Sequence, residues 1–250
     1  MARKDRPLDK TSQGARAHAG GRRVRAETVE WKAKQKEFDR TFGFEELDTA
    51  EPRVGWLLNF NTSVSVGDDK LEYSCLEMFF LKQDGSCFKA FYEYRPYFLV
   101  EAREDTHKEV ATYLQRRFQS VTTDIAVIEK RDMDQPNHLS GIKQKFVKLS
   151  FRNVQDLMFC RKQVMPIAEH NKKKENQNAA YEAFSNGNGK GQGKVSDNIV
   201  GLREYDVPYH VRVAIDNEIR VGSWYRVTKG AGVLTVEHLK DMFVKVRIAW

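Results

Sequence analysis

The most informative stretch of the sequence reads Arg203-Glu204-Tyr205-Asp206-Val207-Pro208-Tyr209-His210-Val211-Arg212. It is followed by Ile215-Asp216 and by Ser223-Trp224-Tyr225. The pattern predicts a short helix over 205–219, because Pro208 then lies in the first helical turn, where a missing amide proton costs nothing. A strand is expected over 222–228. Both elements fit an α+β fold, the class that the rest of the chain also indicates.

Four further blocks lie upstream of this stretch. They read Phe42-Gly43-Phe44-Glu45, Gly55-Trp56-Leu57-Leu58-Asn59, Tyr94-Arg95-Pro96-Tyr97-Phe98 and Asp134-Gln135-Pro136-Asn137-His138-Leu139. Taken in order and with their gaps, from about residue 38 to 228, the five blocks resemble the amino-terminal region of family B DNA polymerases, the epsilon type in particular. The family-like residues of the last block are Arg203, Tyr205, Asp206, Pro208, Tyr209, Arg212 and Trp224.

The resemblance implies a DNA-directed DNA polymerase that adds deoxynucleotides to a primer with Mg²⁺ and proofreads at a separate carboxylate site. It further implies a nuclear enzyme of replication and repair, whose partners are DNA, deoxynucleotides, the remaining polymerase core and accessory replication subunits. Iron–sulfur and zinc sites bound by cysteine are implied outside the present residues. The present region would then be architectural, framing the template side of the core and stiffening the position of the exonuclease.

The residues that carry catalysis in this family are missing here. The family's exonuclease strand, Phe-Asp-Ile-Glu-Thr, has no counterpart, and neither do its polymerase motifs Ser-Leu-Tyr-Pro-Ser and Asp-Thr-Asp-Ser. Phosphoryl transfer by two metals needs carboxylates that hold two cations about 3.5–4 Å apart. We therefore predict no catalytic, cofactor-binding or metal-binding residue in this chain. Because the resemblance fades after about Thr228, truncation before the exonuclease motifs is expected rather than a genuine short paralogue.

The positive charge of the chain is concentrated at its amino terminus. Residues 1–36 hold 11 Lys and Arg against 4 Asp and Glu, a net charge of +7, whereas the remaining residues hold 31 of each. This Gly-, Ala- and Arg-rich tail has no apolar periodicity, so we predict that it is disordered. Arg22, Arg23 and Arg25 are candidate phosphate contacts or part of a nuclear import signal, and a merely solvated tail is the alternative.

An α+β module is predicted over 37–170. A helix is expected at 28–40, a loop at 61–70, and strands at 54–60, 75–81, 87–93, 97–101, 121–129 and 145–151. The dipeptide Asp84-Gly85 predicts a tight hairpin between two of these strands. Thr106 and Glu109 have the capping-box spacing at the start of a helix.

The second half of this module is predicted to alternate strands and helices. Asn153 is expected to cap a helix that Pro166 bends or interrupts. Val147, Leu149 and Phe151 should point inward, against Phe146, Lys148 and Ser150 on the other face. Strand–helix–strand–strand–helix is most of a ferredoxin-like βαββαβ unit, although no strand is evident for its sixth element. Such units can bind RNA through exposed aromatic side chains, but Phe146 alone is a weak signal and structural packing is favoured.

Residues 171–197 have low complexity and almost no apolar content, which predicts a flexible insertion. A phosphate-binding P-loop is not supported, because Lys194 is followed by Val195 rather than by Ser or Thr. Residues 198–230 are expected to lead toward an exonuclease domain that the sequence lacks. Residues 231–250 form a divergent end, in which a strand could still pair within the domain.

Other classes of function find little support in the sequence. Cys75, Cys87 and Cys160 form no Cys-x-x-Cys pair, and the six histidines are scattered, so neither a zinc site nor an iron–sulfur site is predicted. The apolar runs are too short to cross a membrane, and no secretory signal opens the chain. The alternative to a polymerase region is a stand-alone nucleic-acid-binding or interaction module, whose tail supplies the phosphate contacts.

Overall fold

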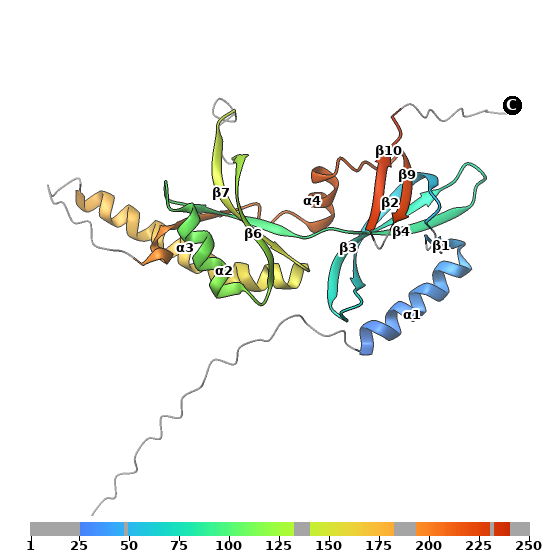
Figure 1. Ribbon diagram of the computed structural model, residues 1–250, viewed down its shortest axis with the longest axis horizontal. Helices are drawn as coiled ribbons and strands as arrows, with labels where there is room; N and C mark the ends of the chain where they lie inside the picture. Colours follow the sequence, from blue (N-terminus) through green and yellow to red (C-terminus); the bar gives the residue numbers. More distant parts are fainter. Residues whose placement is uncertain (1–25, 48–49, 133–140, 183–193, 231–232, 241–250) are drawn as a thin grey trace, which may run out of the picture.

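Two β-sheets lie side by side along the long axis of the molecule, with helix α4 (Tyr209–Asp216) between them (Figure 1). The computed structural model describes residues 26–47, 50–132, 141–182, 194–230 and 233–240. In spatial order, the first sheet contains β1 (Phe44–Glu46), β4 (Cys87–Glu93), β3 (Glu72–Leu81), β2 (Arg53–Val66), β9 (Trp224–Gly230) and β10 (Val233–His238). The second contains β6 (Thr122–Arg131), β7 (Lys143–Phe151), β5 (Tyr97–Ala102) and β8 (Ile199–Arg203).

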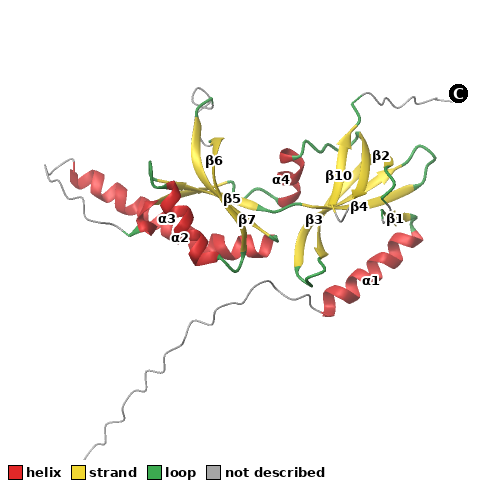
Figure 2. Cartoon of the chain, viewed as in Figure 1, coloured by secondary structure: helices red, strands yellow, loops and turns green. Residues whose placement is uncertain are grey.

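Helices flank both sheets (Figure 2). They are α1 (Ala26–Thr41), α2 (His107–Phe118), α3 (Val154–Glu182), the short 3₁₀ helix η2 (Val195–Asn198) and α4. The α+β class predicted from the sequence is therefore confirmed. In the described part of the chain, no helix is both long and apolar enough to span a membrane.

The predicted hairpin forms between β3 and β4, which pair antiparallel. Gly85 takes a φ of +85° in its turn, a conformation that a residue without a Cβ adopts at little cost. Strand β2 is longer than predicted, since it continues to Val66 through the first part of the stretch expected as a loop (61–70). Residues from Asn61 onward pair with β3. The loop prediction is wrong there because this pairing outweighs the low strand propensity of Asn and Ser.

The core of the first sheet is rich in aromatic residues. The rings of Phe80 and Phe88 stack with centroids 4.9 Å apart, and Tyr225 meets Phe80 edge-on at 6.4 Å. Tyr209 and Val213 of α4 are buried in the same cluster. Helix α4 is thus part of this core and does not merely lie on its surface.

The last described residues add a strand to the first sheet. Strand β10 pairs antiparallel with β9 from Val233 to His238, inside the segment 231–250 that was predicted to be a divergent end. A strand does therefore pair within the domain at this point. Residues 241–250 lie outside the described residues.

The strands of the second sheet and the two helices that cover it follow in the chain order β5, α2, β6, β7, α3 and β8. Each pair of neighbouring strands in this sheet is antiparallel. Its core lies against α2 and α3, where the rings of Phe98 and Phe151 stack 5.4 Å apart. Strand β8, which pairs with β5, was not evident from the sequence. It has only five residues with Gly201 at its centre, and glycine is depleted in strands, so the pattern carries little strand signal.

The opposite face of the second sheet is also covered near its centre. Tyr97, Leu99 and Phe146 form a small buried cluster there, and Phe146 is only 1% exposed. The predicted alternation is confirmed, since Val147, Leu149 and Phe151 lie in the core against α2 and α3 whereas Phe146 lies in the cluster on the other face. The sequence did not show that this second face is also buried, with Arg212 of α4 over the Tyr97 ring. In this arrangement Phe146 is not accessible for the base stacking that an RNA-binding use requires.

Helix α3 begins after Asn153, as predicted. The Asn153 Oδ1 accepts a hydrogen bond from the Asp156 amide at 2.8 Å, and its Nδ2 donates to the Glu72 carbonyl at 3.0 Å. The cap thus also connects α3 to the first sheet. Contrary to prediction, the helix is not interrupted at Pro166 and ends only at Glu182. Pro166 has no amide proton, so the carbonyl four residues earlier lacks its helical hydrogen bond. Because this side of the helix is exposed at Pro166, water can bind that carbonyl instead.

The insertion predicted over 171–197 starts later than expected, because α3 continues into it. A run rich in Lys, Asn and Glu, without Gly or Pro, can extend a helix that is already nucleated. Asn171 is buried, and its Nδ2 donates to the carbonyl oxygens of Ser196 and Ile199 at 2.8 and 2.9 Å. This side chain joins the two ends of the segment. Residues 183–193 lie outside the described residues.

The amino-terminal boundaries also differ from prediction. The helix expected at 28–40 is confirmed, but α1 starts at Ala26, so a disordered tail cannot extend over 1–36. Ala, Glu, Lys and Gln are frequent in this run and favour a helix. At the start of α2 the capping box is not formed. The Thr106 hydroxyl instead donates to the Arg103 carbonyl at 2.8 Å, within the preceding turn.

Asn153→Ala is expected to lower the free energy of unfolding by about 1–2 kcal/mol, because the cap and the bond to Glu72 are lost together. Urea-induced unfolding followed by circular dichroism measures this change. Asn153→Ser keeps an acceptor for the helix amide and should restore part of the loss. An unchanged unfolding midpoint in Asn153→Ala would show that the cap does not stabilise the fold.

Candidate functional site

The family-like stretch lies where the two sheets meet. It leaves β8 at Arg203, turns, and enters α4 at Tyr209. The helix is shorter than the predicted 205–219, because Pro208 has an extended backbone (φ −55°, ψ 139°) and precedes the helix as its N-cap. The segment therefore brings residues of the second sheet's last strand against a helix that is buried in the first sheet's core.

Arg212 is a buried cation at this junction, with a residue exposure of 6%. Its Nη1 lies 2.6 Å from Glu204 Oε2 and 3.8 Å from Asp216 Oδ1. The same nitrogen donates to the Tyr97 hydroxyl at 3.1 Å, and the guanidinium lies 4.7 Å from the centroid of the Tyr97 ring. A buried charge needs paired and hydrogen-bonded neighbours, and the fixed fork of arginine can serve several of them at once. Arg212 therefore connects α4 to strand β5.

Tyr97 is surrounded by cations. In addition to Arg212, Lys148 Nζ lies 4.1 Å and Lys130 Nζ lies 5.6 Å from the centroid of its ring. Cation–π contacts are stronger when the cation is shielded from water. Burial raises the pKa of the Tyr97 hydroxyl well above its usual value, although Arg212 opposes the shift. The hydroxyl therefore stays protonated.

Glu204 is the main acidic partner of this cluster. Its Oε2 accepts a hydrogen bond from Lys130 Nζ at 2.8 Å and also pairs with Arg212. Its backbone has a φ of +57°, which costs about 1–2 kcal/mol for a residue with a Cβ. The two ion pairs help to hold Glu204 in this conformation, and the turn directs its carboxylate to both cations.

Helix α4 is also bonded to the end of the first sheet. The Tyr209 hydroxyl lies 2.9 Å from the carbonyl oxygen of Ser74 and 2.8 Å from that of Tyr94. Burial raises the pKa of Tyr209, which keeps this donor protonated. The Tyr94 hydroxyl donates to Asp216 Oδ2 at 2.6 Å, and burial together with this bond raises the pKa of Tyr94. These bonds thus hold α4 at both of its ends, Tyr209 and Asp216.

The other predicted residues of the stretch have separate surroundings. Arg203 pairs with Glu101 at 2.9 Å and with Asp132 at 3.3 Å. The Tyr205 ring lies 4.6 Å from the guanidinium of Arg161 on α3. Both contacts fix the turn against the second sheet and its helix. Asp206 and Pro208 are exposed.

Trp224 lies in the first sheet, away from this group. It is paired with Trp56 across β9 and β2, and the two rings meet edge-on at 5.7 Å. Within the described residues, its indole N–H has no hydrogen-bond partner. The structure therefore gathers Arg203, Tyr205, Tyr209 and Arg212 at the junction and leaves Trp224 outside it. The candidate phosphate contacts Arg22, Arg23 and Arg25 lie outside the described residues.

Three residues of the junction were not predicted as site residues. Glu204 and Tyr97 both lie inside the sequence blocks that resemble the polymerase family. That position was the one feature of the sequence that could have marked them as site residues. Lys130 lies in strand β6 without any local marker. Its place beside Tyr97 follows from the strand order β6-β7-β5, which the sequence pattern does not specify.

The charged side chains at the junction form ion pairs with one another. This arrangement can hold the two sheets together. Among the described residues, no group of three or more His, Cys, Asp or Glu side chains could hold a metal ion. Cys75, Cys87 and Cys160 form no disulfide bond. Burial raises the pKa of Cys160 to about 12, so this thiol is protonated and unreactive near neutral pH.

An open groove of about 860 Å³ lies between the β3–β4 turn and β10. Two ion pairs are part of its lining, Lys82 with Asp84 at 3.8 Å and Arg226 with Glu237 at 3.0 Å. These opposite charges offset one another. Lys240 adds one further basic side chain, so the lining carries charges of both signs with a small excess of positive charge.

Comparison with known proteins identifies the family. No protein-family model matches the chain. A DNA polymerase epsilon catalytic subunit from Arabidopsis thaliana is 38% identical over 236 residues, which cover 91% of this chain and 11% of that protein. The corresponding catalytic subunit of DNA polymerase epsilon from Aspergillus fumigatus is 37% identical over 220 residues, covering 81% of this chain and 10% of that protein.

A solved structure of the family B DNA polymerase from the hyperthermophilic archaeon Pyrobaculum calidifontis aligns with a TM-score of 0.44 and 18% identity. The alignment covers 75% of this chain and 20% of that one. The chain spans about a tenth of the length of the curated relatives it matches. By its sequence similarity to these relatives, the chain belongs to the family of DNA polymerase epsilon catalytic subunits.

Proposed function

We propose that this chain is an architectural, non-catalytic region of an epsilon-type replicative DNA polymerase. Template-directed DNA synthesis and proofreading belong, in this proposal, to the rest of a longer protein. The observation that carries the proposal is the junction around Arg212, where two sheets with separate hydrophobic cores are connected by buried ion pairs and hydrogen bonds. A region that positions a catalytic core needs a fixed shape more than accessible reactive groups.

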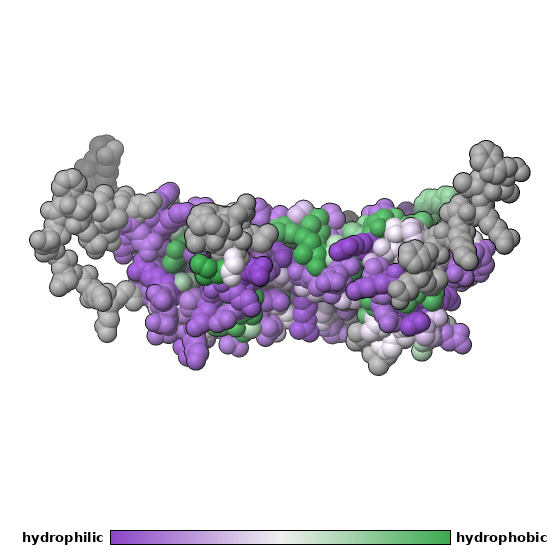
Figure 3. All heavy atoms as spheres, turned by 90° about the horizontal axis from the view of Figure 1, so that it is seen from above, coloured by the Kyte–Doolittle hydropathy of each residue, from purple (hydrophilic) through white to green (hydrophobic). Residues whose placement is uncertain are grey.

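The surface and the charge of the folded part support the same role. Outside residues 1–36, Lys and Arg are balanced by equal numbers of Asp and Glu. An independent DNA-binding domain usually carries a basic face. Figure 3 shows a mainly hydrophilic surface with small, separate hydrophobic areas. These features favour contacts with other protein over a large DNA interface.

The remaining roles are inferred from family membership. The complete protein is proposed to act in the nucleus on DNA and deoxynucleotides, in replication and repair, together with the remaining polymerase core and accessory subunits. Its Mg²⁺ sites and its cysteine-bound iron–sulfur and zinc sites are assigned to other parts of the longer chain. Cys75, Cys87 and Cys160 are too far apart in the sequence to form a Cys-x-x-Cys pair, which supports the last assignment.

We also infer that the second sheet and its helices form a ferredoxin-like unit. The chain order β5, α2, β6, β7, α3, β8 and the spatial order β6-β7-β5-β8 support this inference. Strand β8 is the sixth element of the βαββαβ pattern. The face of its sheet opposite α2 and α3 would then lie toward α4, where Arg212 covers the Tyr97 ring.

Arg212→Leu is expected to lower the free energy of unfolding by roughly 2–4 kcal/mol, because Glu204 and Asp216 lose a buried cationic partner. Urea titration measures this change. Arg226→Leu is the matched control, since Arg226 forms an exposed ion pair with Glu237. Such pairs contribute only about 0–1 kcal/mol. Equal effects of the two substitutions would contradict a special role for Arg212.

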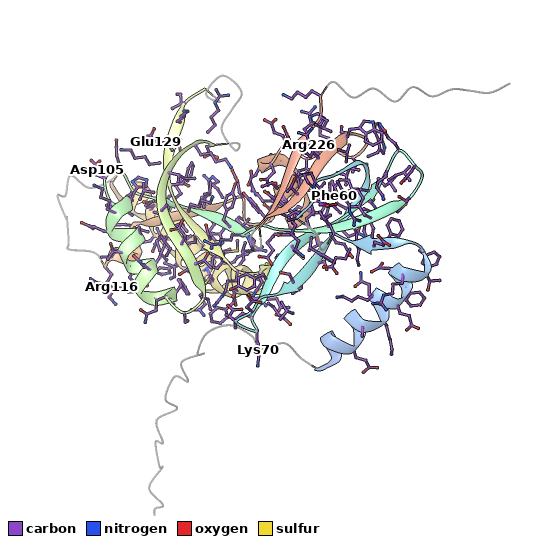
Figure 4. All side chains as sticks on the ribbon, turned by 45° about the vertical axis from the view of Figure 1, so that its right-hand side comes forward. Phe60, Lys70, Asp105, Arg116, Glu129 and Arg226 are labelled. Carbon is purple, nitrogen blue, oxygen red and sulfur yellow. The ribbon has the colours of Figure 1, made fainter. Side chains whose placement is uncertain are left out.

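The architectural role also predicts that Arg212 fixes the arrangement of the two sheets. Spin labels at Glu129 and Arg226, exposed residues on separate sheets (Figure 4), report the distance between the sheets by pulsed electron paramagnetic resonance. Cys87 is first replaced by Ser, because the other two thiols are buried. A broader distance distribution is expected in Arg212→Leu. Identical distributions with and without Arg212 would refute the architectural role assigned to it.

The purified chain is expected to incorporate no deoxynucleotide in a primer-extension assay with Mg²⁺, because its sequence lacks the family's paired carboxylate motifs. A complete polymerase of the same family provides the positive control. Incorporation that co-purifies with the chain through several columns would overturn the assignment of catalysis to other regions.

We further propose that Arg22, Arg23 and Arg25 contact DNA phosphates. Each phosphate contact contributes roughly −0.9 to the slope of log K against log salt, so replacing all three by Ala should make the slope less negative by up to roughly 2.7. Fluorescence anisotropy with labelled duplex DNA measures the slope. Replacing the exposed residues Lys172, Lys173 and Lys174 is the control and should leave it unchanged. An unchanged slope in the tail variant would disprove these contacts.

A further inference from the structure

Helix α1 rests on the first sheet through polar contacts. None of its described side chains is buried, and only Gln35 and Asp39 are half-buried. The Gln35 amide donates to both carboxylate oxygens of Glu77 on β3, at 3.2 Å each. Asp39 forms an ion pair with Lys89 on β4, and the exposed Lys36 forms a longer one with Glu46 on β1 at 3.7 Å. A helix is usually held on a sheet by an apolar stripe, and among the described side chains of α1 these polar contacts take its place.

The large apolar side chains at the end of α1 point to solvent. Phe38 is 65% exposed, and Phe42, which follows the helix directly, is 69% exposed. The Phe42 amide donates to the Phe38 carbonyl at 3.0 Å, so the two residues continue one helical turn. Burial of these rings would be favourable, but the docked position does not bury them. Apolar burial of these side chains therefore does not fix the position of α1.

Lys89 is the centre of the contacts below α1. It is 3% exposed, and its Nζ lies 3.0 Å from Glu77 Oε1 in addition to its bond with Asp39. Burial by itself lowers the pKa of Lys89, but the bonds to Asp39 and Glu77 outweigh burial and raise it overall. The two carboxylates are not equivalent. Glu77 belongs to the same sheet as Lys89, whereas Asp39 is brought by the helix.

We propose that α1 is a releasable helix, held on the first sheet mainly by the Asp39–Lys89 ion pair and able to leave while the sheet stays folded. When α1 leaves, Lys89 keeps Glu77 as its partner, and the sheet loses no apolar contact to Phe38 or Phe42. A helix of 16 residues is marginally stable alone in water, so the released segment also loses its helical hydrogen bonds. Of the ion pairs between α1 and the first sheet, the one between Asp39 and Lys89 is then the only one with both partners largely shielded from water among the described residues.

Hydrogen–deuterium exchange of the complete chain tests this release. Asp39→Asn is expected to raise the exchange rate of the amides from Gln35 to Arg40 by about tenfold or more, because a charge-assisted bond is weakened. The amides of β3 and β4 should keep the protection that they have in the parent chain. Lys34→Gln is the matched control on the same helix. It removes the exposed ion pair of Lys34 with Glu30 and should change nothing.

Lys89→Met removes the same ion pair from the sheet side and is the second variant. It is also expected to accelerate exchange in α1. If both variants kept the parent protection of α1, other contacts would hold the helix and the proposal would be wrong. Lys89→Met also leaves the buried Glu77 without this partner, so only α1 is compared in that variant. Equally faster exchange in α1, β3 and β4 of Asp39→Asn would overturn the proposal as well, because helix and sheet would then open as one unit.

Discussion

One buried guanidinium, that of Arg212, fixes the two sheets relative to one another. The two large hydrophobic cores remain separate, one on each sheet. Burial alone therefore does not determine how the sheets are oriented. Arg212 must keep its partners because a desolvated charge without them is costly. That requirement positions Glu204 in its left-handed turn, Tyr97 on β5 and Asp216 at the end of α4.

A polar junction differs from an apolar one in its directionality. Hydrophobic contact is non-directional, so two apolar faces can slide with little loss of buried area. Hydrogen bonds weaken steeply when their angles change. The bonds of Tyr209 to the Ser74 and Tyr94 carbonyls, and of Asn153 to Glu72, add further directional contacts at the same boundary. A region proposed to position a larger enzyme gains a defined shape from such contacts.

Sequence reasoning succeeded for two features whose chemistry is local, although the equally local capping box of Thr106 and Glu109 does not form. The Asp84-Gly85 turn and the Asn153 cap depend on neighbouring residues, and both form as predicted. It failed where distant segments decide the outcome. The burial of Phe146 depends on Tyr97 and Leu99 of β5, and the place of Lys130 depends on the strand order. The family-like stretch contained the central arginine, but no pattern in it shows which strand Arg212 would reach.

The side-chain amide of Asn171 has a consequence for how this chain can vary. It bonds to the carbonyls of Ser196 and Ile199, so two points that are 25 and 28 positions away in sequence are held beside α3. The start of β8 is therefore fixed locally, at the side chain of Asn171, before the strand enters the second sheet. A family can lengthen or shorten this connection, and an engineer can place a fluorescent domain or an affinity tag in it, without disturbing the sheets.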